Sequence, residues 1–409
     1  MGRGFHRLVC LLTTSNYWNA IDGDPQFLSA LLKKLFPGLV TGDIGDLIVA
    51  VVDFVPLPAP TPEPNDSPES VSRNANLGDG ISVAVIAEKS SKSPVWHRTS
   101  SRSVSPPGDP GILSFRFSNI EQQELSLHMP LANTIFTNGR PNTMRVQRWK
   151  MKGQTGEDPG LTLERGMDLT DLTLDLLNAD NGSGRTSAVG IQSHLRRFTP
   201  PRAVQAVTGN ILRQLDGEEG TPQPASRELE IMIDQQFRTG QVKRGSLEIF
   251  ALVEPQICSE TSIVGSPIDL KSTFMQGGRL YKVLSGGGGW GEKQGLLALE
   301  PSSWLDQQSA DFQDRDEDSK TGFFDSIVRR GEFITFAVND AASERLATPL
   351  SNYQDHDLSL NFGCAESGMD DGSNETGKGT TMEGHKPFTY ASGLFGMLST
   401  RGIYLQVRQ

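Results

Sequence analysis

Apolar runs at the start of the chain predict two strands with a helix between them. Residues 8–14 are an extended apolar stretch, and residues 47–55 form a continuous apolar and β-branched run, which is typical of a strand covered on both faces. Between them, residues 25–36 carry apolar side chains at helical spacing, and Pro37 with Gly38 ends that pattern. Strand, helix and strand in this order predict an α/β arrangement for the first part of the chain.

Further extended segments follow, and long polar stretches separate them. Strands are predicted at residues 81–87, 112–117, 124–130 and 144–151, whereas the pattern at 161–177 leaves the structure open. The intervening stretches near residues 58–79 and 90–109 are rich in Pro, Ser and Asn, and a third polar insertion lies near 367–387. Such segments hold too little apolar surface to order themselves, so we predict three disordered insertions, the first two of which leave and re-enter one sheet.

The pattern changes near residue 200. Helices are expected at 201–215 and 224–237, and their predicted buried face consists of Val204, Val207, Ile211, Leu229 and Met232. Beyond them, strands are predicted at 246–254, on both sides of a glycine-rich turn within 280–299, at 332–338, and as a closing pair of strands within 393–407.

These elements predict two halves with mixed sheets. Residues 1–200 form a mixed α/β half, and residues 201–409 form a helix pair followed by a mainly β half. The predicted fold class is α/β, with α+β as the alternative.

Composition narrows the classes of partner. The 409 residues carry a formal net charge of −11, which argues against a general nucleic-acid or anionic-membrane binder. The three cysteines are far apart, no apolar run is long enough to span a bilayer, and a cytoplasmic location is the simplest fit. The weakly basic N-terminus leaves mitochondrial targeting as an alternative.

The most distinctive stretch is the glycine-rich run, which consists of Gly286, Gly287, Gly288, Gly289, Trp290 and Gly291, with Lys293 close behind. It lacks the crossover helix of a dinucleotide site and the Lys-Ser/Thr pair of a phosphate loop. The run is typical of a hairpin tip, and the alternative is a nest of backbone amides that binds a small anionic or zwitterionic ligand. These seven residues are therefore the predicted ligand-binding site.

A local basic strip comprises Arg140, Arg145, Arg148, Lys150 and Lys152. With Trp149 as a stacking platform the strip is compatible with a phosphate or RNA backbone, but a solvated strand face is favoured. On the strand predicted at 124–130, His128 lies on the polar face with Glu124 and Ser126, which indicates a solvent-facing side chain.

Catalytic and metal-binding motifs are absent or incomplete. The acidic loop at 311–325 departs from a calcium loop at its sixth and twelfth positions, and the stretch 372–380 has a glycine in place of the phosphate-loop hydroxyl. Two His-containing acidic clusters, at 355–357 and 383–385, have no fixed metal-ligand spacing. We therefore predict no metal and no cofactor, and whether the protein is an enzyme stays open.

Two short segments are similar to FIST-type sensory domains. Residues 131–140 resemble the closing strand of the N-terminal half of these domains, and residues 328–336 resemble a turn and strand of their C-terminal half. The resemblance implies a module that binds small ligands, such as amino acids, and that acts with protein partners in signalling or ubiquitin ligation. No ligand residue is carried over by it.

The sequence thus leaves two classes of function. The first is a non-catalytic small-ligand-binding or regulatory module, with a protein partner as a further expectation. The alternative is an enzyme or accessory factor of a biosynthetic pathway whose site lies at the glycine-rich loop between the two halves.

Overall fold

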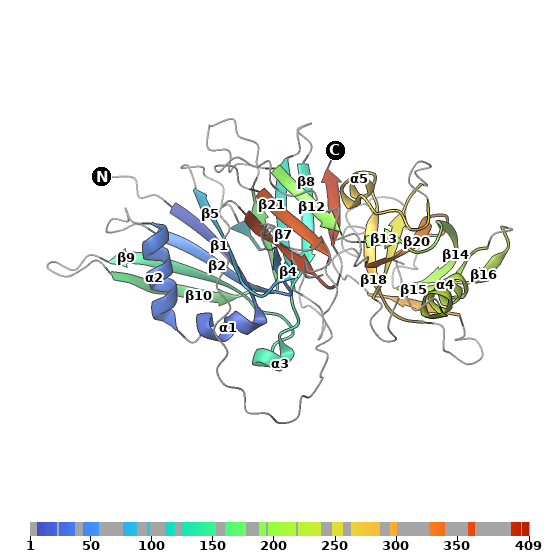
Figure 1. Ribbon diagram of the computed structural model, residues 1–409. Coiled ribbons are helices and arrows are strands. Elements are labelled where there is room, and N and C mark those ends of the chain that lie inside the picture. Colours follow the sequence, from blue (N-terminus) through green and yellow to red (C-terminus); the bar gives the residue numbers. More distant parts are fainter. Residues whose placement is uncertain are drawn as a thin grey trace, which may run out of the picture.

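A computed structural model shows a mainly β protein in two parts (Figure 1). Among the described residues 54% lie in strands and 19% in helices, so the predicted α/β class is confirmed only in part. The structure describes residues 6–22, 24–36, 44–56, 77–87, 96–98, 111–118, 124–152, 160–176, 188–193, 195–217, 220–238, 248–256, 263–286, 295–300, 327–339, 359–364, 394–401 and 403–408.

The α/β part is a five-stranded sheet covered by two helices. β1 (His6–Thr14) and β2 (Ile44–Val52) pair in parallel, and α1 (Ser15–Asp22) and α2 (Pro25–Leu35) connect them, which confirms the predicted strand–helix–strand unit and adds one helix to it. β5 (Ile81–Ala87) extends the sheet beside β1. β9 (Met144–Lys152) and β10 (Gly160–Asp168) extend it beside β2.

Two further sheets cover the other face of this sheet. One has the order β23 (Tyr404–Arg408), β8 (Glu124–Pro130), β7 (Ile112–Ser118), β11 (Asp171–Asp175) and β6 (Trp96–His97). The other is a parallel sheet of β12 (Ala188–Ser193), β21 (Ser359–Cys364) and β22 (Leu394–Ser399). The short strands β3 (Val55–Pro56) and β4 (Leu77–Gly78) pair with each other. We call this layered part the sandwich.

The alternation of side chains along β1 separates two cores. Leu8 and Cys10 face the β layers, where they join a cluster that includes Phe115 of β7, whereas Val9 and Leu11 face the helices. Because successive strand residues point to opposite faces, a run that is apolar throughout indicates a strand buried on both sides. β2 alternates in the same way, with Ile48 in the first cluster and Leu47 in the second, so the prediction of a strand covered on both faces at 47–55 is confirmed.

The second part is a closed six-stranded antiparallel barrel. Its strands follow the order β17 (Ile249–Glu254), β18 (Arg279–Gly286), β19 (Leu297–Leu299), β15 (Ile211–Asp216), β14 (Arg202–Thr208) and β20 (Phe333–Asn339), and β20 pairs back to β17. β13 (Leu195–Arg197) also pairs with β20, and β16 (Pro222–Pro224) pairs with β15.

Apolar side chains fill the barrel. Val253, Tyr281 and Phe336 are among the buried residues of this core, and the Tyr281 hydroxyl donates a hydrogen bond to the Ile327 carbonyl at 3.2 Å. The helix α4 (Arg227–Arg238) packs Leu229 against the barrel. The interior is therefore a packed core.

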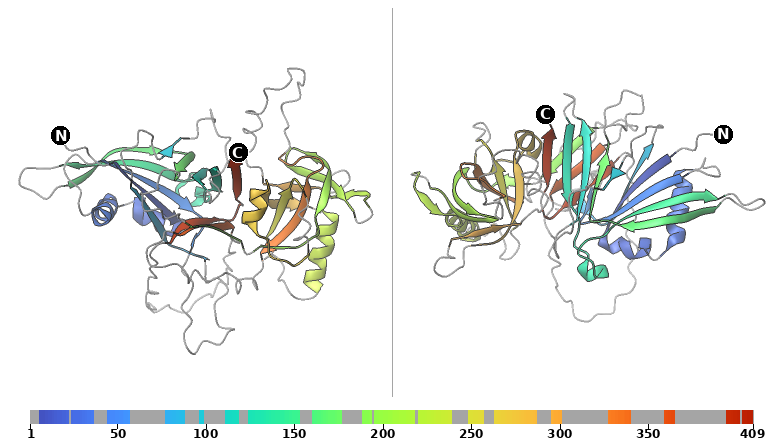
Figure 2. Two further views of the ribbon diagram at one scale, coloured as in Figure 1. Left: turned by 90° about the horizontal axis from the view of Figure 1, so that it is seen from above. Right: turned by 180° about the vertical axis from the view of Figure 1, so that it is seen from behind.

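The barrel and the sandwich share a continuous apolar core. Phe250, Leu252 and Leu280 lie on the outer face of the barrel and belong to the same cluster as Phe115 and Phe362 of the sandwich. The short helix α5 (Leu270–Met275) lies between the two parts and contacts β12 and β23. Figure 2 shows the two parts side by side, with β23 between them. The halves thus form one packed unit.

One predicted helix and the predicted burial of one residue are wrong. Residues 202–216 form the hairpin β14–β15, and a turn at Gly209 occupies the middle of the predicted first helix, whereas the second helix is confirmed as α4. Val204 and Leu229 are buried as expected, Val207 and Met232 are half-buried, and Ile211 is 37% exposed. The predicted burial of Ile211 is therefore wrong.

The predicted arrangement at the C-terminus also needs correction. β22 and β23 do not pair with each other, because β22 joins β21 and β23 joins β8. The chain thus returns to the sandwich after residue 359, so this part lies with the first half and not within the second.

The three predicted insertions lie mostly outside the described residues. Residues 58–76, 99–109 and 367–387 are among those that the structure does not describe. Within the predicted ranges, Leu77–Gly78 forms β4 and Trp96–His97 forms β6, so both ranges were too long. Trp96 is held by its Nε1, which donates to Asp46 Oδ2 at 3.1 Å. The prediction of one common sheet is wrong, because β5 and β7 belong to different sheets.

Gly295 offers a test of the barrel. Its φ is +81°, and a Cβ there would clash with Cβ of Pro224. We expect Gly295→Ala to lower the free energy of unfolding by about 2–4 kcal/mol, which combines left-handed strain with overpacking. The control Gly209→Ala has a φ of +58° and open space around the new Cβ, so it should cost only about 1–2 kcal/mol. Chemical denaturation of both variants measures the difference, and equal losses would contradict the close approach to Pro224.

Candidate functional site

The glycine-rich run connects two paired strands, as the hairpin interpretation predicts. Gly286 pairs with Leu297 at the end of β18 and β19, and residues 287–294, which include Trp290 and Lys293, lie outside the described part of the chain. On the far flank, the Gly295 carbonyl accepts a hydrogen bond at 3.1 Å from the backbone N–H of Ser226, the residue before α4. Ligand binding by this run stays a prediction.

The flank at Gly295 also locates the run. α4 lies at the outer end of the barrel, away from the sandwich (Figure 1). The described flank of the glycine-rich run therefore lies beside α4 rather than beside the joint between the two halves.

The other candidate motifs contribute no site within the described residues. The segments 311–325, 355–357, 372–380 and 383–385 lie outside these residues, and no metal-binding group of His, Cys, Asp and Glu occurs among the residues that are described. His128 is half-buried instead of solvent-facing, and its Nδ1 is 2.7 Å from the Ser114 hydroxyl. Burial raises the pKa of the Cys10 thiol well above its ordinary value, so this thiol is not an activated nucleophile.

The basic strip is largely neutralised by carboxylates. The Arg148 guanidinium donates to both carboxylate oxygens of the buried Asp46, at 2.9 and 3.1 Å. Trp149 is only 3% exposed and donates from Nε1 to Gln147. A buried indole cannot stack on a base, so the structure does not support the nucleic-acid alternative.

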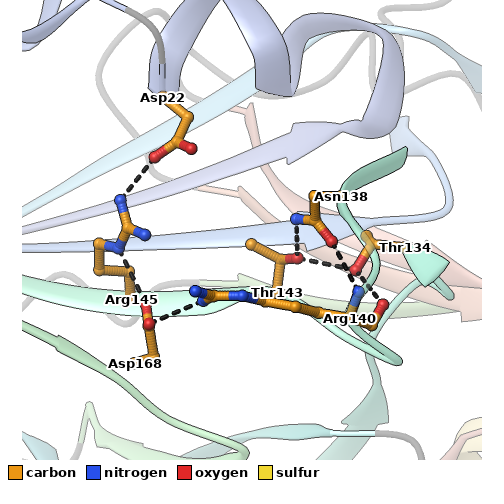
Figure 3. Close-up of polar contacts among 7 residues, drawn as sticks. All are labelled: Asp22, Thr134, Asn138, Arg140, Thr143, Arg145 and Asp168. Atoms are coloured by element: carbon orange, nitrogen blue, oxygen red, sulfur yellow. Dashed lines mark hydrogen bonds and ion pairs between the residues drawn. The ribbon is translucent and has the colours of Figure 1, made fainter. Parts of the chain in front are cut away.

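The loop between β8 and β9, residues 131–143, is locked by side-chain hydrogen bonds (Figure 3). We call it the tip loop. The Thr134 and Thr143 hydroxyls are 2.7 Å apart, and Asn138 Nδ2 donates to Thr143 Oγ1 at 2.7 Å. Asn138 Oδ1 accepts from the Arg140 N–H, and Thr134 Oγ1 donates to the Arg140 carbonyl. Gly139 ends the one-turn helix α3 (Ile135–Asn138) with a φ of +75°.

An ion-pair chain fixes the side of the tip loop (Figure 3). Asp168 at the end of β10 accepts from Arg140 Nη1 at 2.7 Å and from Arg145 Nε at 2.9 Å. Arg145 also pairs with Asp22 at the end of α1, and its guanidinium lies 5.9 Å from the ring centroid of Trp18. The loop is thereby tied to both a strand and a helix.

The two arginines of this ion-pair chain stabilise the ionised form of Asp168. Partial burial alone would raise the pKa of Asp168, but the hydrogen bonds and charges of Arg145 and Arg140 outweigh it, and the pKa lies below its ordinary value. Asp168 therefore stays ionised over the whole neutral range.

This stiff loop presents apolar side chains to solvent. Phe136 is 100% exposed and Ile135 is 48% exposed, although the backbone around them is held by the hydrogen bonds described above. The turn signal at Asn138 and Gly139 is visible in the sequence, but the exposure of Phe136 is not. From sequence alone, an apolar residue in a segment that is expected to be ordered is predicted to lie in a core.

A second polar cluster lies where the barrel meets the sandwich. We call it the joint cluster, and it consists of Asp53, Glu248, Lys282, Glu300, Thr400 and Arg401. Asp53 Oδ2 accepts from the Thr400 N–H at 2.8 Å and from its hydroxyl at 2.9 Å. Lys282 Nζ is 2.8 Å from Glu248 Oε1, and Arg401 Nε is 3.9 Å from Glu300 Oε1.

Burial dominates the electrostatics of the joint cluster. It raises the pKa of Asp53, although the Thr400 hydrogen bonds and the charges of Arg401 and Lys282 act in the opposite direction. Burial also raises the pKa of Glu300; Arg401 and Lys282 oppose this shift, and the charge of Asp53 adds to it.

Comparison with protein families, with curated proteins and with solved structures found no match. The similarity of residues 131–140 and 328–336 to FIST-type domains therefore stays a hypothesis. In the structure the first of these segments is mainly the tip loop and not a strand. Among the residues described, no helix is long and apolar enough to cross a membrane.

Asp168 offers a test of the ion-pair chain. Asp168→Asn removes the shared partner of Arg140 and Arg145, and we expect it to lower the free energy of unfolding by less than about 1 kcal/mol, because these side chains are half-exposed. The folded pKa of Asp168 is lowered, so its stabilisation is present above the unfolded value of about 3.9 and is lost as the pH falls through the folded value.

The pH dependence of unfolding measures this effect. The difference between wild type and Asp168→Asn should vanish at acidic pH. Asp234→Asn is the matched control, since Asp234 forms an exposed ion pair with Arg238. A loss no greater than that of the control would contradict the role of Asp168.

Proposed function

We propose that the protein is a non-catalytic binding module that engages a protein partner through the tip loop. The observation that carries this proposal is the full exposure of Phe136 on a loop whose backbone is already fixed. The sequence leads to the same class of function, but it points to a different element.

Rigidity makes this exposure informative. Single exposed apolar residues are common on protein surfaces, but a partner gains most from one that needs no ordering. Burying a phenylalanine side chain contributes about 2–3 kcal/mol, and the fixed loop keeps more of this as net affinity. Aromatic anchors that enter a partner's pocket carry a large share of binding energy in protein interfaces.

The charges around the loop favour a protein over a nucleic acid or an anionic membrane. Arg140 and Arg145 are paired with Asp168 and Asp22, so the positive charges of these two arginines are compensated. The net charge of −11 also argues against a nucleic-acid or anionic-membrane partner. A partner with an apolar pocket and a polar, uncharged rim fits this surface best.

Replacement of Phe136 tests the proposal. We expect Phe136→Ala to weaken the complex at least about 30-fold, as loss of a central aromatic anchor does, with an unchanged melting temperature. Leu284→Ala is the matched control, because Leu284 is 52% exposed on β18 of the barrel. A photoreactive residue at position 136, compared with one at 284, identifies the partner, and titration of the purified partner measures the affinities.

Two outcomes would contradict the proposal. One is equal cross-linking from positions 136 and 284. The other is an unchanged dissociation constant for Phe136→Ala with every partner that cross-links. Cross-linking to a second copy of the chain, with loss of self-association in Phe136→Ala, identifies that copy as the partner.

A second candidate function is binding of a small anionic or zwitterionic ligand at Gly286–Gly291. The specific observation in its favour is the contact between Gly295 and Ser226, because it brings the flank of the glycine-rich run to the N-terminus of α4. Backbone amides and a helix N-terminus both favour negative charge. Lys293 follows the run in the sequence and would add a positive charge.

A thermal-shift panel tests this second function. Amino acids, nucleotides and sugar phosphates are added to wild type and to Gly288→Val, whose side chain would block close approach to the loop backbone. A ligand at 100 times its dissociation constant adds about 2.7 kcal/mol of stability, and we expect this shift in wild type only. Equal shifts in both proteins would exclude the loop as the site.

A further inference from the structure

The joint cluster joins segments that are remote in the sequence. Asp53 follows β2, and Thr400 and Arg401 follow β22, so these three belong to the sandwich. The barrel contributes Lys282 from β18 and Glu300 from the end of β19, where the Glu300 N–H donates to the Lys282 carbonyl at 2.8 Å. Protonation of this cluster therefore acts on the contact between the two parts.

Carboxylates outnumber cations in the cluster. Among the residues that the structure describes, the cluster holds three carboxylates, those of Asp53, Glu248 and Glu300, and two cations, those of Lys282 and Arg401. The close contact of Lys282 is with Glu248, and Arg401 is 3.9 Å from Glu300, which is a loose pair. Elsewhere in the barrel, Arg202 makes two hydrogen bonds to Glu228, at 2.7 and 2.8 Å.

We propose that the joint between barrel and sandwich is a proton-linked contact, in which Asp53 or Glu300 takes up a proton as the pH falls and the contact between the two parts becomes stronger. This device is separate from the tip loop and does not depend on the proposed partner.

The physical basis is the cost of burying surplus charge. A carboxylate loses hydration on burial, and two of them repel each other unless cations compensate fully. Burial raises the pKa of both groups, and the charge of Asp53 adds to the shift of Glu300. The cluster holds one carboxylate more than it holds cations, so uptake of a single proton by Asp53 or Glu300 removes the surplus negative charge.

The sign of the pH dependence follows. Both folded pKa values lie above the unfolded values of about 4. Their contribution to stability is therefore fully present below about pH 4 and is lost as the pH rises through the folded values. This is opposite to the behaviour of Asp168, whose folded pKa is lowered.

The experiment compares neutral isosteres with wild type in the full chain. Asp53→Asn retains an oxygen that accepts from Thr400, and Glu300→Gln retains the shape of the side chain. At about pH 8 each single variant should have a higher melting temperature than wild type, and this advantage should shrink as the pH is lowered towards about 4. The double variant removes two negative charges where one is in surplus, so it should gain no more than the single variants. Glu228→Gln is the control, and it should lower the melting temperature at about pH 8 because it breaks a fully compensated pair.

A second readout reports on the joint itself. Hydrogen exchange of β18 and β22 amides, corrected for intrinsic rates, should slow several-fold in wild type between about pH 8 and about pH 5, and β9 should not respond. The double variant should show no such change. Carboxyl titration of wild type by NMR gives the two pKa values directly, independent of whether any variant folds.

Three outcomes would overturn the proposal. They are melting temperatures below wild type at about pH 8 for Asp53→Asn and Glu300→Gln alike, exchange that responds equally in β9 and β22, or carboxyl pKa values at or below about 4.

Discussion

The apolar core shared by the barrel and the sandwich is the constraint on which the rest of the structure depends. Phe115 of β7 lies against Phe362 of β21 at a ring-centroid distance of 4.6 Å, and the same cluster reaches Phe250 and Leu280 on the outer face of the barrel. Two domains that meet over a small polar interface move freely, whereas a continuous apolar core fixes their orientation. The packing of this core therefore determines where the polar groups at the joint lie.

That constraint explains why the two charged clusters differ. At the tip loop the side chains are partly exposed. Arg140 and Arg145 pair with Asp168, and solvent screens the charge that these pairs do not compensate. At the joint, Asp53 is held by Thr400 and cannot move towards a cation. The apolar packing supplies enough free energy to bury the surplus charge, and the cost appears as raised carboxyl pKa values.

The fold was predictable where one periodicity dominates. The continuous apolar runs that form β1 and β2 and the helical spacing in α2 were sufficient for the strand–helix–strand unit. The hairpin at 202–216 was not, because register shifts between Val204 and Val207 break the alternation and leave apolar residues at intervals that also fit a helix. The pair Gly209-Asn210 in its middle was the contrary signal, since a glycine with positive φ fits a turn. The pairing of β23 with β8 spans most of the chain, and no local pattern reports on it.

The candidate sites were less predictable than the fold, for two different reasons. Phe136 is apolar in any pattern, and only its 100% exposure on a loop locked by Thr134, Asn138 and Thr143 separates it from a core residue. The joint cluster arises from topology, since Asp53, Glu300 and Arg401 are far apart in the sequence and meet only because the chain returns to the sandwich after the barrel. The glycine-rich run was chosen as the candidate site from sequence because its composition is unusual. Unusual composition does not distinguish a ligand-binding loop from a turn. Exposure of an apolar group and burial of a surplus charge both carry a cost, and for that reason they are stronger indications of function than rarity.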